Sequence, residues 1–394
     1  MLIADRLQSL QPSLTISLNA RAQELRAGGI DVTSLAIGEP DFPTPAHVRE
    51  AAKNAIDANF TRYTAAPGIP ELRKAVGGYF ERQYGVPVPP ESVIVSAGAK
   101  HAVFNLAQGL LNPGDEAIIP APYWLSYPPI VELAGGRPVT FLAGADRGFK
   151  ITPDMLETRR SSRTKLLVLN SPSNPTGVVY TQAELDALVS WAISHKIFVL
   201  SDEIYDQLVF EPAEAASAIG WFAKYPDLVG VLNGASKTFA MTGWRVGWLV
   251  GHPDLIKKLS ALQGQSTSGV CSIAQKAALA ALTGPADCVA DMRGAFQRRR
   301  DAAMKIINSW PLAVCPQPDG AFYLFVDVHR SYTGAIKSST DMCAHLLDKA
   351  LVSMVPGAAF GDDNCMRLSY AVADDVLKAA LERVGEELAK LASG

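Results

Sequence analysis

Residues 228–247 read LVGVLNGASKTFAMTGWRVG, an apolar run followed by a turn of small residues that contains one lysine, with one arginine further on. The apolar run from Leu228 to Leu232 predicts a buried strand, and Lys237 lies just beyond the end of that strand, in the turn. Ligands of open α/β sheets gather at the ends of such strands. The stretch therefore places a lysine where a ligand would bind.

Taken alone, Lys237 would be interpreted as a solvated surface residue, which is the usual position of a lysine. Its neighbours favour another interpretation. A lysine amine condenses with the aldehyde of pyridoxal phosphate to form a Schiff base, and Ser236 and Arg245 supply donors and charge for the phosphate. The Ser-Lys-Thr triplet also occurs in nucleotide P-loops, but the two glycines required before the lysine are missing at P-loop spacing. The stretch predicts a pyridoxal phosphate site.

The length and composition of the chain limit the classes of protein to which it can belong. At 394 residues the chain is long enough for two domains, or for one large domain with a smaller appendage. With 48% hydrophobic residues, 19% charged residues and a net charge of −3, neither disorder nor a nucleic-acid footprint is indicated, and small-molecule partners are expected. Five scattered cysteines without C-x-x-C spacing predict reduced thiols and no metal site. An early charge and no bilayer-length apolar run predict a cytoplasmic protein without a membrane partner.

Short β-rich runs alternate with helical stretches in the middle of the chain. Alternation of this kind predicts an α/β fold with a mostly parallel seven-stranded sheet that is flanked by helices on both faces. One expected crossover helix is Gln182 to Ile193, with Thr181 as its N-cap. The expected strands are residues 93–95, 116–119, 138–142, 166–169, 197–200, 228–232 and 246–250.

The pattern changes after about residue 290. A basic helix at Arg293 to Arg300 is followed by an apolar, hairpin-like segment around Phe322 to Val328 and by helices near residues 341–350 and 374–391. These features predict a second, smaller α+β domain.

The N-terminal residues contain a helix, Ala20 to Ala27, and then prolines that suit an irregular arm. Three parts of the chain are therefore expected. They are an N-terminal arm and small-domain segment at residues 1–45, a large cofactor-binding domain at 46–288, and a C-terminal small domain at 289–394.

Polar residues follow two further predicted strands. Asp202 ends one of them, and a buried carboxylate beside a pyridine nitrogen keeps that nitrogen protonated, so that the ring accepts electrons. Tyr205, three residues on, is placed to bond the ring hydroxyl, and Asn174 lies in a turn-rich loop that could aim its amide at the same hydroxyl. Judged alone, Asp202 would be a helix N-cap or loop carboxylate and Asn174 part of an Asx turn.

A third turn combines small residues with a helix start. The strand at Val93 to Val95 leads into Ser96-Ala97-Gly98-Ala99-Lys100 and then into a helix around His101 to Leu110. Small residues let a phosphate approach the backbone N–H groups of a helix N-terminus, where the helix dipole favours an anion. By itself this is a weak signal.

Together and in this order, these segments resemble the class I aminotransferases of fold type I, and within them the bacterial aspartate aminotransferase subgroup Iβ. The resemblance covers nearly the whole chain. It is carried by Ala36-Ile37-Gly38-Glu39-Pro40-Asp41-Phe42, Tyr63-Thr64-Ala65-Ala66-Pro67-Gly68, Asn170-Ser171-Pro172-Ser173-Asn174-Pro175-Thr176-Gly177, Ser201-Asp202-Glu203-Ile204-Tyr205, Ser236-Lys237 and Arg367-Leu368-Ser369-Tyr370-Ala371.

The resemblance implies a role for each of these segments. Lys237 would anchor pyridoxal phosphate and carry the proton, Asp202 would pair with the pyridine nitrogen, and Tyr205 would bond the ring hydroxyl. A homodimer with shared sites is also implied, in which Tyr63 reaches across to the phosphate of the other subunit. The implied cofactor-binding residues are Tyr63, Gly98, Ala99, Lys100, Trp124, Asn174, Asp202, Tyr205, Ser236, Lys237 and Arg245.

The same resemblance implies how an amino acid or 2-oxo acid substrate is held. Arg367 would grip the α-carboxylate with its bidentate fork, assisted by Asn174 and the backbone of Gly38. A dicarboxylic substrate needs a second cation, and Lys100, beside Trp124, is the implied one. The activity implied is a ping-pong transfer of the amino group from L-aspartate to 2-oxoglutarate.

Several alternatives remain open. Aromatic, prephenate or alanine aminotransferases and a pyridoxal phosphate lyase share this fold and chemistry. Relatives that act on prephenate commonly carry a basic residue where this chain has Gln11, which weakens that interpretation. A cofactor-sensing transcription regulator would need an extra basic DNA-binding domain, and a nicotinamide dehydrogenase would need an early G-x-G-x-x-G, which the sequence lacks.

Overall fold

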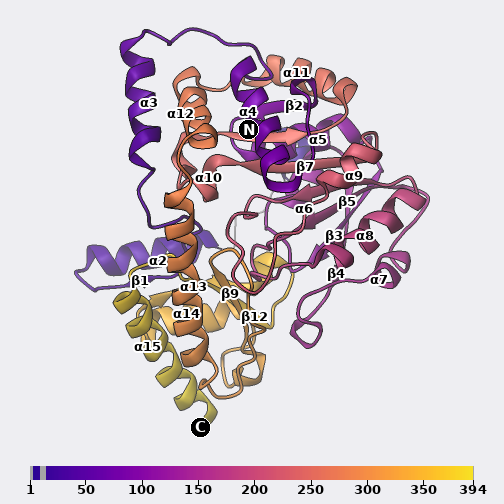
Figure 1. Ribbon diagram of the computed structural model, residues 1–394. Helices are drawn as coiled ribbons and strands as arrows, with labels where there is room; N and C mark the ends of the chain where they lie inside the picture. The colour runs from indigo at the N-terminus through magenta and orange to yellow at the C-terminus, as the bar shows by residue number, and fades with distance from the viewer. Residues whose placement is uncertain (1–2, 9–14, 394) are drawn as a thin grey trace.

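A computed structural model describes residues 3–8 and 15–393 of the chain. Gln11, on which the interpretation of prephenate specificity depends, lies outside the described residues, as do the first two residues of the chain. The centre of the molecule is a seven-stranded sheet with the strand order β2-β8-β7-β6-β5-β3-β4 (Figure 1).

Six of the seven strands run in one direction, and β8 alone is antiparallel to its neighbours. The connection from β7 to β8 stays at the carboxyl edge of the sheet, where it forms α10 (Ala235–Thr238) and η3 (Thr242–Trp244) instead of crossing a face. The predicted mostly parallel seven-stranded α/β sheet is confirmed. Its strands are β2 (Val93–Ser96), β3 (Glu116–Ala121), β4 (Arg137–Leu142), β5 (Thr164–Asn170), β6 (Phe198–Asp202), β7 (Val229–Gly234) and β8 (Gly247–Val250).

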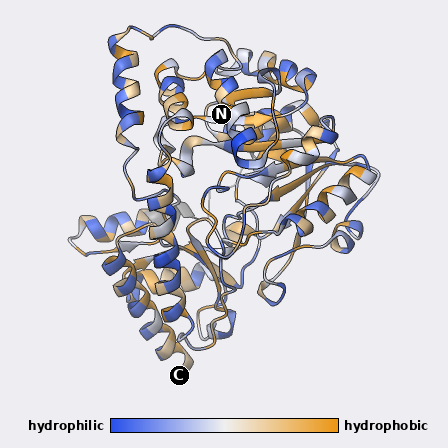
Figure 2. Cartoon of the chain, viewed as in Figure 1, coloured by the Kyte–Doolittle hydropathy of each residue, from blue (hydrophilic) through white to orange (hydrophobic). Residues whose placement is uncertain are grey.

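Helices cover both faces of the sheet, so its strands other than the edge strand β4 are buried at nearly every position and mainly apolar (Figure 2). Successive residues of a strand point to opposite faces, so Leu166 and Leu167 belong to different buried clusters. One face packs against α5 (Ala99–Leu110), α6 (Tyr127–Leu133) and α11 (Pro253–Ser266). The other packs against α4 (Pro70–Tyr84), α8 (Gln182–Ser194), α9 (Ile219–Lys224) and α12 (Ser272–Thr283).

The start of α8 follows from its sequence. The Thr181 hydroxyl accepts a hydrogen bond from the backbone N–H of Glu184, and the Glu184 carboxylate accepts one from the backbone N–H of Thr181. This capping box satisfies two donors that the first helical turn leaves free. The predicted N-cap at Thr181 is confirmed.

A smaller layer of mixed structure lies beside the large sheet, around its own buried cluster (Figure 1). It contains an antiparallel sheet of order β11-β12-β9 and a parallel pair of β1 with β10. Its strands are β1 (Thr33–Ser34), β9 (Tyr323–Asp327), β10 (Val352–Ser353), β11 (Val355–Pro356) and β12 (Cys365–Ser369). Its helices are α2 (Thr15–Ala27), α13 (Asp287–Ile307), α14 (Ser339–Lys349) and α15 (Asp374–Ser393).

The expectation of a hairpin around Phe322 to Val328 is met only by one isolated antiparallel bridge, between Val314 and Asp327. Along its length β9 pairs with β12, which follows it in the chain only after α14, so the apolar run marks a strand whose main partner is distant in sequence. The division into residues 1–45, 46–288 and 289–394 stays a prediction. The remaining elements are α1 (Asp5–Gln8), α3 (Ala46–Asp57), α7 (Pro153–Glu157), η1 (Pro90–Ser92), η2 (Ala145–Arg147), η4 (His329–Ser331) and η5 (Gly357–Phe360).

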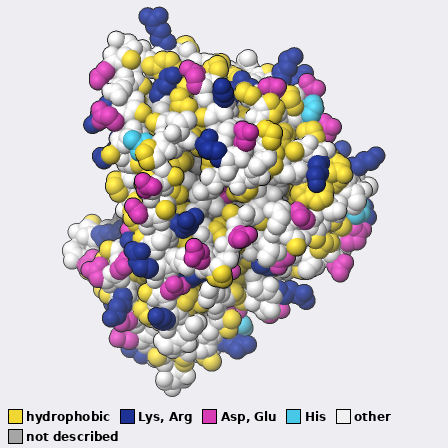
Figure 3. Space-filling model, viewed as in Figure 1, with side chains coloured by type: hydrophobic (Ala, Val, Ile, Leu, Met, Phe, Trp, Pro, Cys, Tyr) yellow, Lys and Arg dark blue, Asp and Glu magenta, His cyan; other side chains and the backbone are white. Residues whose placement is uncertain are grey.

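Among the described residues, the visible surface has no patch of a single charge that would indicate a particular class of partner. On the face seen in Figure 3, acidic and basic side chains are interspersed among apolar and neutral ones. Within residues 3–8 and 15–393, no helix has the length and apolarity needed to cross a bilayer.

Candidate active site

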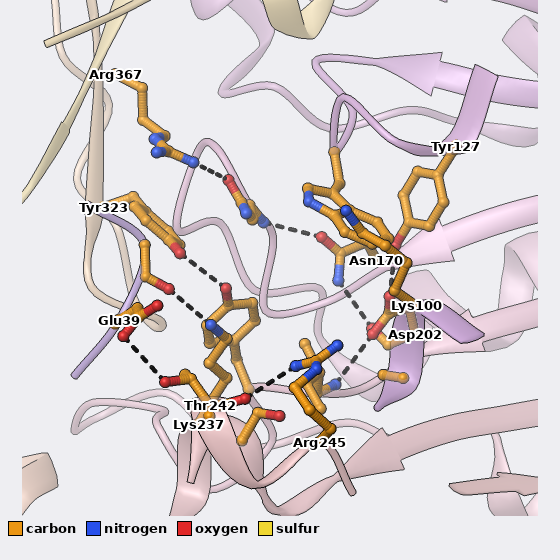
Figure 4. A pocket seen from close by; sticks show the side chains of 18 residues that line it. Glu39, Lys100, Tyr127, Asn170, Asp202, Lys237, Thr242, Arg245, Tyr323 and Arg367 are labelled. Atoms are coloured by element: carbon orange, nitrogen blue, oxygen red, sulfur yellow. Dashed lines mark hydrogen bonds between the residues drawn. The ribbon is translucent and has the colours of Figure 1, made fainter. Parts of the chain in front are cut away.

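A cavity of about 490 Å³ lies at the carboxyl ends of β5, β6 and β7, and side chains of β9 and β12 complete its wall. This is the edge at which open α/β sheets bind ligands. Of the residues predicted for the site, all but Tyr63 and Gly98 line the cavity. Its lining is Gly38, Glu39, Ala99, Lys100, Trp124, Tyr127, Asn170, Asn174, Asp202, Ile204, Tyr205, Ser236, Lys237, Thr242, Gly243, Arg245, Tyr323 and Arg367 (Figure 4).

Lys237 projects from α10, directly after β7, into this cavity. Its Nζ donates a hydrogen bond of 2.6 Å to the carbonyl oxygen of Gly38 and lies 6.0 Å from the centre of the Tyr205 ring. Burial lowers the pKa of Lys237 to about 8, while the nearby carboxylate of Glu39 opposes that shift. The amine therefore loses its proton far more readily than a solvated lysine does.

Asp202 ends β6 and is only 4% exposed. Its Oδ2 accepts a hydrogen bond of 2.6 Å from the Tyr127 hydroxyl, and its Oδ1 accepts one of 3.2 Å from the backbone N–H of Ile204. Burial raises the pKa of Asp202 to about 6, although both hydrogen bonds favour the ionised form. A cationic group placed next to Asp202 would lower this pKa and favour the ionised carboxylate.

Tyr205 lies one turn beyond Asp202, and its ring is buried. Its hydroxyl is 2.9 Å from the hydroxyl of Tyr323, which comes from β9 in the smaller layer. Burial raises the pKa of Tyr205 well above its ordinary value, so the phenol stays protonated and can donate a hydrogen bond. The tyrosine pair joins the two layers at the wall of the cavity.

The turn after β2 and the arginine after β7 meet at one end of the cavity. Gly98, at a φ of +84°, is the N-cap of α5, and a Cβ atom at this position would lie 2.5 Å from Nη2 of Arg245. Arg245 donates a hydrogen bond of 2.9 Å to the carbonyl oxygen of Thr242. The positive φ thus favours glycine at this position, and the missing side chain leaves room for the guanidinium. A helix N-terminus and an arginine together favour an anion here.

Arg367 enters the cavity from β12 and is 6% exposed. Its Nη1 donates to Oδ1 of Asn174 at 2.9 Å, its Nη2 donates to the carbonyl oxygen of Ala36 at 2.9 Å, and its Nε has no partner. Among the described residues no carboxylate forms an ion pair with Arg367. A buried cation without a counter-ion and with a free donor fits a bound carboxylate.

Lys100 lies in the first turn of α5, and its Nζ is 5.0 Å from the centre of the Trp124 ring. Desolvation and the neighbouring Arg245 lower the pKa of Lys100. Within the described part of the chain it has no ion-pair partner either. The cavity therefore presents a second cation, beside an aromatic ring.

Gly98 adjoins the cavity through Arg245, whereas Tyr63 points into solvent and is 99% exposed. Five further polar residues of the lining were not predicted from the sequence: Glu39, Tyr127, Asn170, Thr242 and Tyr323. Of these, Tyr127 had a signal, because it follows Trp124 by three positions and would share its face of a helical turn. Asn170 also had one, because it directly follows the predicted strand 166–169, and Thr242 lies in the stretch between Lys237 and Arg245. Glu39 and Tyr323 reach the cavity through contacts between distant segments.

The residues present fit pyridoxal phosphate. An amine of lowered pKa, a buried carboxyl with room for a cation and a protonated phenol surround one space, and an anion site of helix N-terminus and arginine lies beside them. The free Nε of Arg367 leaves a place for a substrate carboxylate in the same cavity. These are the groups that this cofactor and an amino acid need.

Comparisons with known proteins give the family. A profile described as aminotransferase class I and II matches residues 30–384. The chain is 45% identical over 389 residues to the aspartate/prephenate aminotransferase of Cereibacter sphaeroides, covering 97% of each chain. It is 43% identical over 386 residues to the aspartate aminotransferase of Geobacillus stearothermophilus, covering 98% of each. The chain belongs to the class I and II aminotransferases.

A solved structure supports the same assignment. The aspartate aminotransferase of Rhizobium meliloti matches with a TM-score of 0.95 and 38% identity, covering 99% of each chain. The predictions of a pyridoxal phosphate-dependent transaminase and of its fold type are therefore confirmed. Membership of subgroup Iβ stays a prediction.

Proposed function

We propose that the protein is an aspartate aminotransferase, which reversibly transfers the amino group of L-aspartate to 2-oxoglutarate and releases oxaloacetate and L-glutamate. One observation carries the proposal. Beside Lys237 and Arg245, which are assigned to the cofactor, the cavity is lined by two more cations without ion-pair partners among the described residues, Arg367 and Lys100. Arg367 suits the α-carboxylate of any amino acid, and Lys100 suits the second carboxylate of aspartate. The names of the relatives from Cereibacter sphaeroides and Geobacillus stearothermophilus agree with this substrate.

The cofactor contacts expected from the sequence are part of the proposal. Asp202 would meet the pyridine nitrogen and Tyr205 the ring hydroxyl, with Asn174 assisting and Trp124 against the ring. The remaining contacts, at the phosphate, are assigned to the turn of Gly98 and Ala99 and to Ser236 and Arg245. Bound pyridoxal phosphate supplies an aldehyde that takes up the amino group and a ring that accepts electrons.

Lys237 is proposed as the residue that moves protons. With a pKa of about 8, its Nζ exists partly as the free amine near neutral pH and can accept the proton of the substrate α-carbon. Arg367 and Lys100 hold the two carboxylates, so the α-carbon is confined to the space that Nζ faces. The first 2-oxo acid leaves before the second enters, which gives ping-pong kinetics.

We also propose a homodimer in which Tyr63 completes the phosphate site of the other subunit. A tyrosine that is 99% exposed is unusual for a large aromatic side chain and suits a contact with a second chain. A hollow of about 650 Å³ beside Arg245, lined mainly by small and apolar residues, offers a surface for it. Sedimentation of a fully active monomer would contradict the dimer. The cytoplasmic location stays a prediction.

The name of the Cereibacter sphaeroides relative favours a second candidate, an enzyme that also accepts prephenate. Purified holoenzyme assayed with aspartate, prephenate plus glutamate, an aromatic amino acid and alanine would rank these substrates by kcat/KM. We expect aspartate to rank first. A higher value for any other substrate would replace aspartate in the proposal, and elimination products in place of the amine form of the cofactor would indicate a lyase.

A further inference from the structure

Asn170 lines the cavity, and its side chain contacts the backbone of three other residues. It ends β5, and strand pairing places it beside Asp202 at the end of β6. Its Nδ2 lies 3.0 Å from the carbonyl oxygen of Asp202 and 3.3 Å from that of Pro172. Its Oδ1 accepts a hydrogen bond of 2.8 Å from the backbone N–H of Asn174. One orientation of the amide satisfies all three groups, because only the NH₂ end can face two carbonyls.

These contacts join the two ends of the candidate active site. Asp202 offers its carboxyl to the ring end of the cavity, whereas Oδ1 of Asn174 accepts a hydrogen bond of 2.9 Å from the guanidinium of Arg367. In Figure 4 one dashed line joins Asn170 to Asp202 and another begins at the guanidinium of Arg367. The two bonds of Asn174, to Arg367 and to Asn170, connect them. Asn170 is the middle member of this series.

We propose that Asn170 is a positioning residue for amino transfer, which fixes the spacing between the carboxyl that meets the cofactor ring and the pair that receives the substrate carboxylate. The inference rests on the function proposed above. Amino transfer requires the substrate α-carbon and the cofactor to meet in one geometry, and errors of about 1 Å slow such reactions markedly. Because one amide side chain is bonded both to Asp202 and to Asn174, it limits changes in the distance between the cofactor end and the substrate end of the cavity.

The ordinary role of this side chain would be to close a turn. The hydrogen bond from the backbone N–H of Asn174 to Oδ1 of Asn170 closes such a turn, and no residue of β6 takes part in it. The donation by Nδ2 to Asp202 is different, because it crosses to another strand, where the backbone N–H of Ser171 already donates to the same carbonyl at 3.2 Å. The second bond adds a link between strands that closure of the turn does not require.

Asn170→Asp tests this role with little change in size. The carboxylate still accepts from Asn174 N–H, but it cannot donate and places negative charge against two carbonyl oxygens. Ser171→Ala is the matched control, because it removes the bond from Tyr180 N–H to the Ser171 hydroxyl in the same loop without touching either end of the site. Asn170→Ser serves as a second, neutral variant in case the carboxylate prevents folding.

Two dissociation constants and the thermal midpoint would be measured for each protein. The first constant is that of the apoenzyme for pyridoxal phosphate, and the second is that of the holoenzyme for maleate, a dicarboxylate that has no amino group. We expect Asn170→Asp or Asn170→Ser to raise both constants about tenfold. Ser171→Ala should lower the thermal midpoint and leave both constants near those of wild type. Variants at Asn170 that lower only the midpoint would overturn the inference.

A double-mutant cycle separates the two ends. In an Asn174→Ala background, Asn170→Asp should raise the dissociation constant for maleate no further, because Asn170 acts on the substrate end through Asn174. The same substitution should still raise the dissociation constant for pyridoxal phosphate. If the two substitutions instead raise the dissociation constant for maleate independently, so that their free-energy effects add, the inference is overturned. Failure of the wild-type protein to bind either probe would instead contradict the proposed function, and the inference with it.

Discussion

The Tyr127 hydroxyl donates a hydrogen bond of 2.6 Å to Oδ2 of Asp202, and both side chains are buried. Tyr127 comes from α6 and Asp202 from the end of β6, so the bond joins a helix on one face of the sheet to the edge where the cofactor is proposed to bind. It stabilises the ionised form of a carboxyl whose pKa burial raises.

Tyr127→Phe should therefore raise the pKa of Asp202 further and weaken its pairing with the cofactor ring. Loss of a hydrogen bond to a charged group costs about 1.5–3 kcal/mol, so we expect kcat for aspartate to fall roughly tenfold or more. The affinity of the apoenzyme for pyridoxal phosphate should fall as well. Tyr332→Phe, which loses a bond to a backbone carbonyl far from the cavity, is the control and should change neither value.

Arg367→Lys keeps the charge but loses the planar fork and the bond to Asn174. Because every amino acid presents an α-carboxylate, kcat/KM for aspartate and for alanine should fall together, by roughly 100-fold or more. The exposed Arg330→Lys is the matched control. A variant that keeps either activity near the wild-type value would show that the carboxylate binds elsewhere.

Lys100→Met should separate aspartate from alanine. The distal carboxylate of aspartate loses its counter-ion, at a cost of about 1.5–3 kcal/mol, so kcat/KM for aspartate should fall about 10- to 100-fold while that for alanine hardly changes. Lys257→Met, at an exposed position of α11, controls for loss of a surface charge. Equal losses for the two amino acids would remove the role assigned to Lys100.

Glu203 gives a prediction about stability and pH. It is buried, and burial raises its pKa to about 8, although Ser201, Ser217 and the N–H of Ala218 donate to it. Between its model-peptide value near 4.5 and about pH 8 the folded protein holds a proton that the unfolded chain has lost, so this group's contribution to stability decreases as pH rises.

Glu203→Gln should remove that part of the pH dependence. In urea unfolding of the apoenzyme, the wild type should lose more free energy of unfolding than the variant between pH 5 and pH 8, by an amount on the order of several kcal/mol. Identical losses in the two proteins would mean that Glu203 is ionised in the folded state throughout this range.

Much of the site could be predicted because its residues follow strands. Asp202, Asn174 and Lys237 each come at or shortly after the end of an apolar run, and parallel strands bring their carboxyl ends to one edge. The local pattern also gave the cap of α8 at Thr181, where side chain and backbone are only three residues apart.

What could not be predicted depends on contacts between distant segments. Tyr323 lies beside Tyr205 on a strand, β9, whose five-residue ladder is formed with the distant β12, and nothing local to residues 322–328 encodes that choice of partner. Glu39 likewise reaches the cavity on a segment whose hydrogen bond partner, Thr242, lies about half the chain away. Periodicity and turn residues describe elements, whereas such pairings are decided by the packing of the whole chain.

The most direct test of the central claim is a visible absorption spectrum of the purified holoenzyme before and after addition of L-aspartate, with oxaloacetate assayed in the same cuvette and Lys237→Ala as the control. We predict that aspartate converts the cofactor absorption to that of its amine form and releases one oxaloacetate for each cofactor, and that the variant does neither at a comparable rate. A cofactor band that aspartate leaves unchanged, or a Lys237→Ala variant with wild-type turnover, would contradict the account.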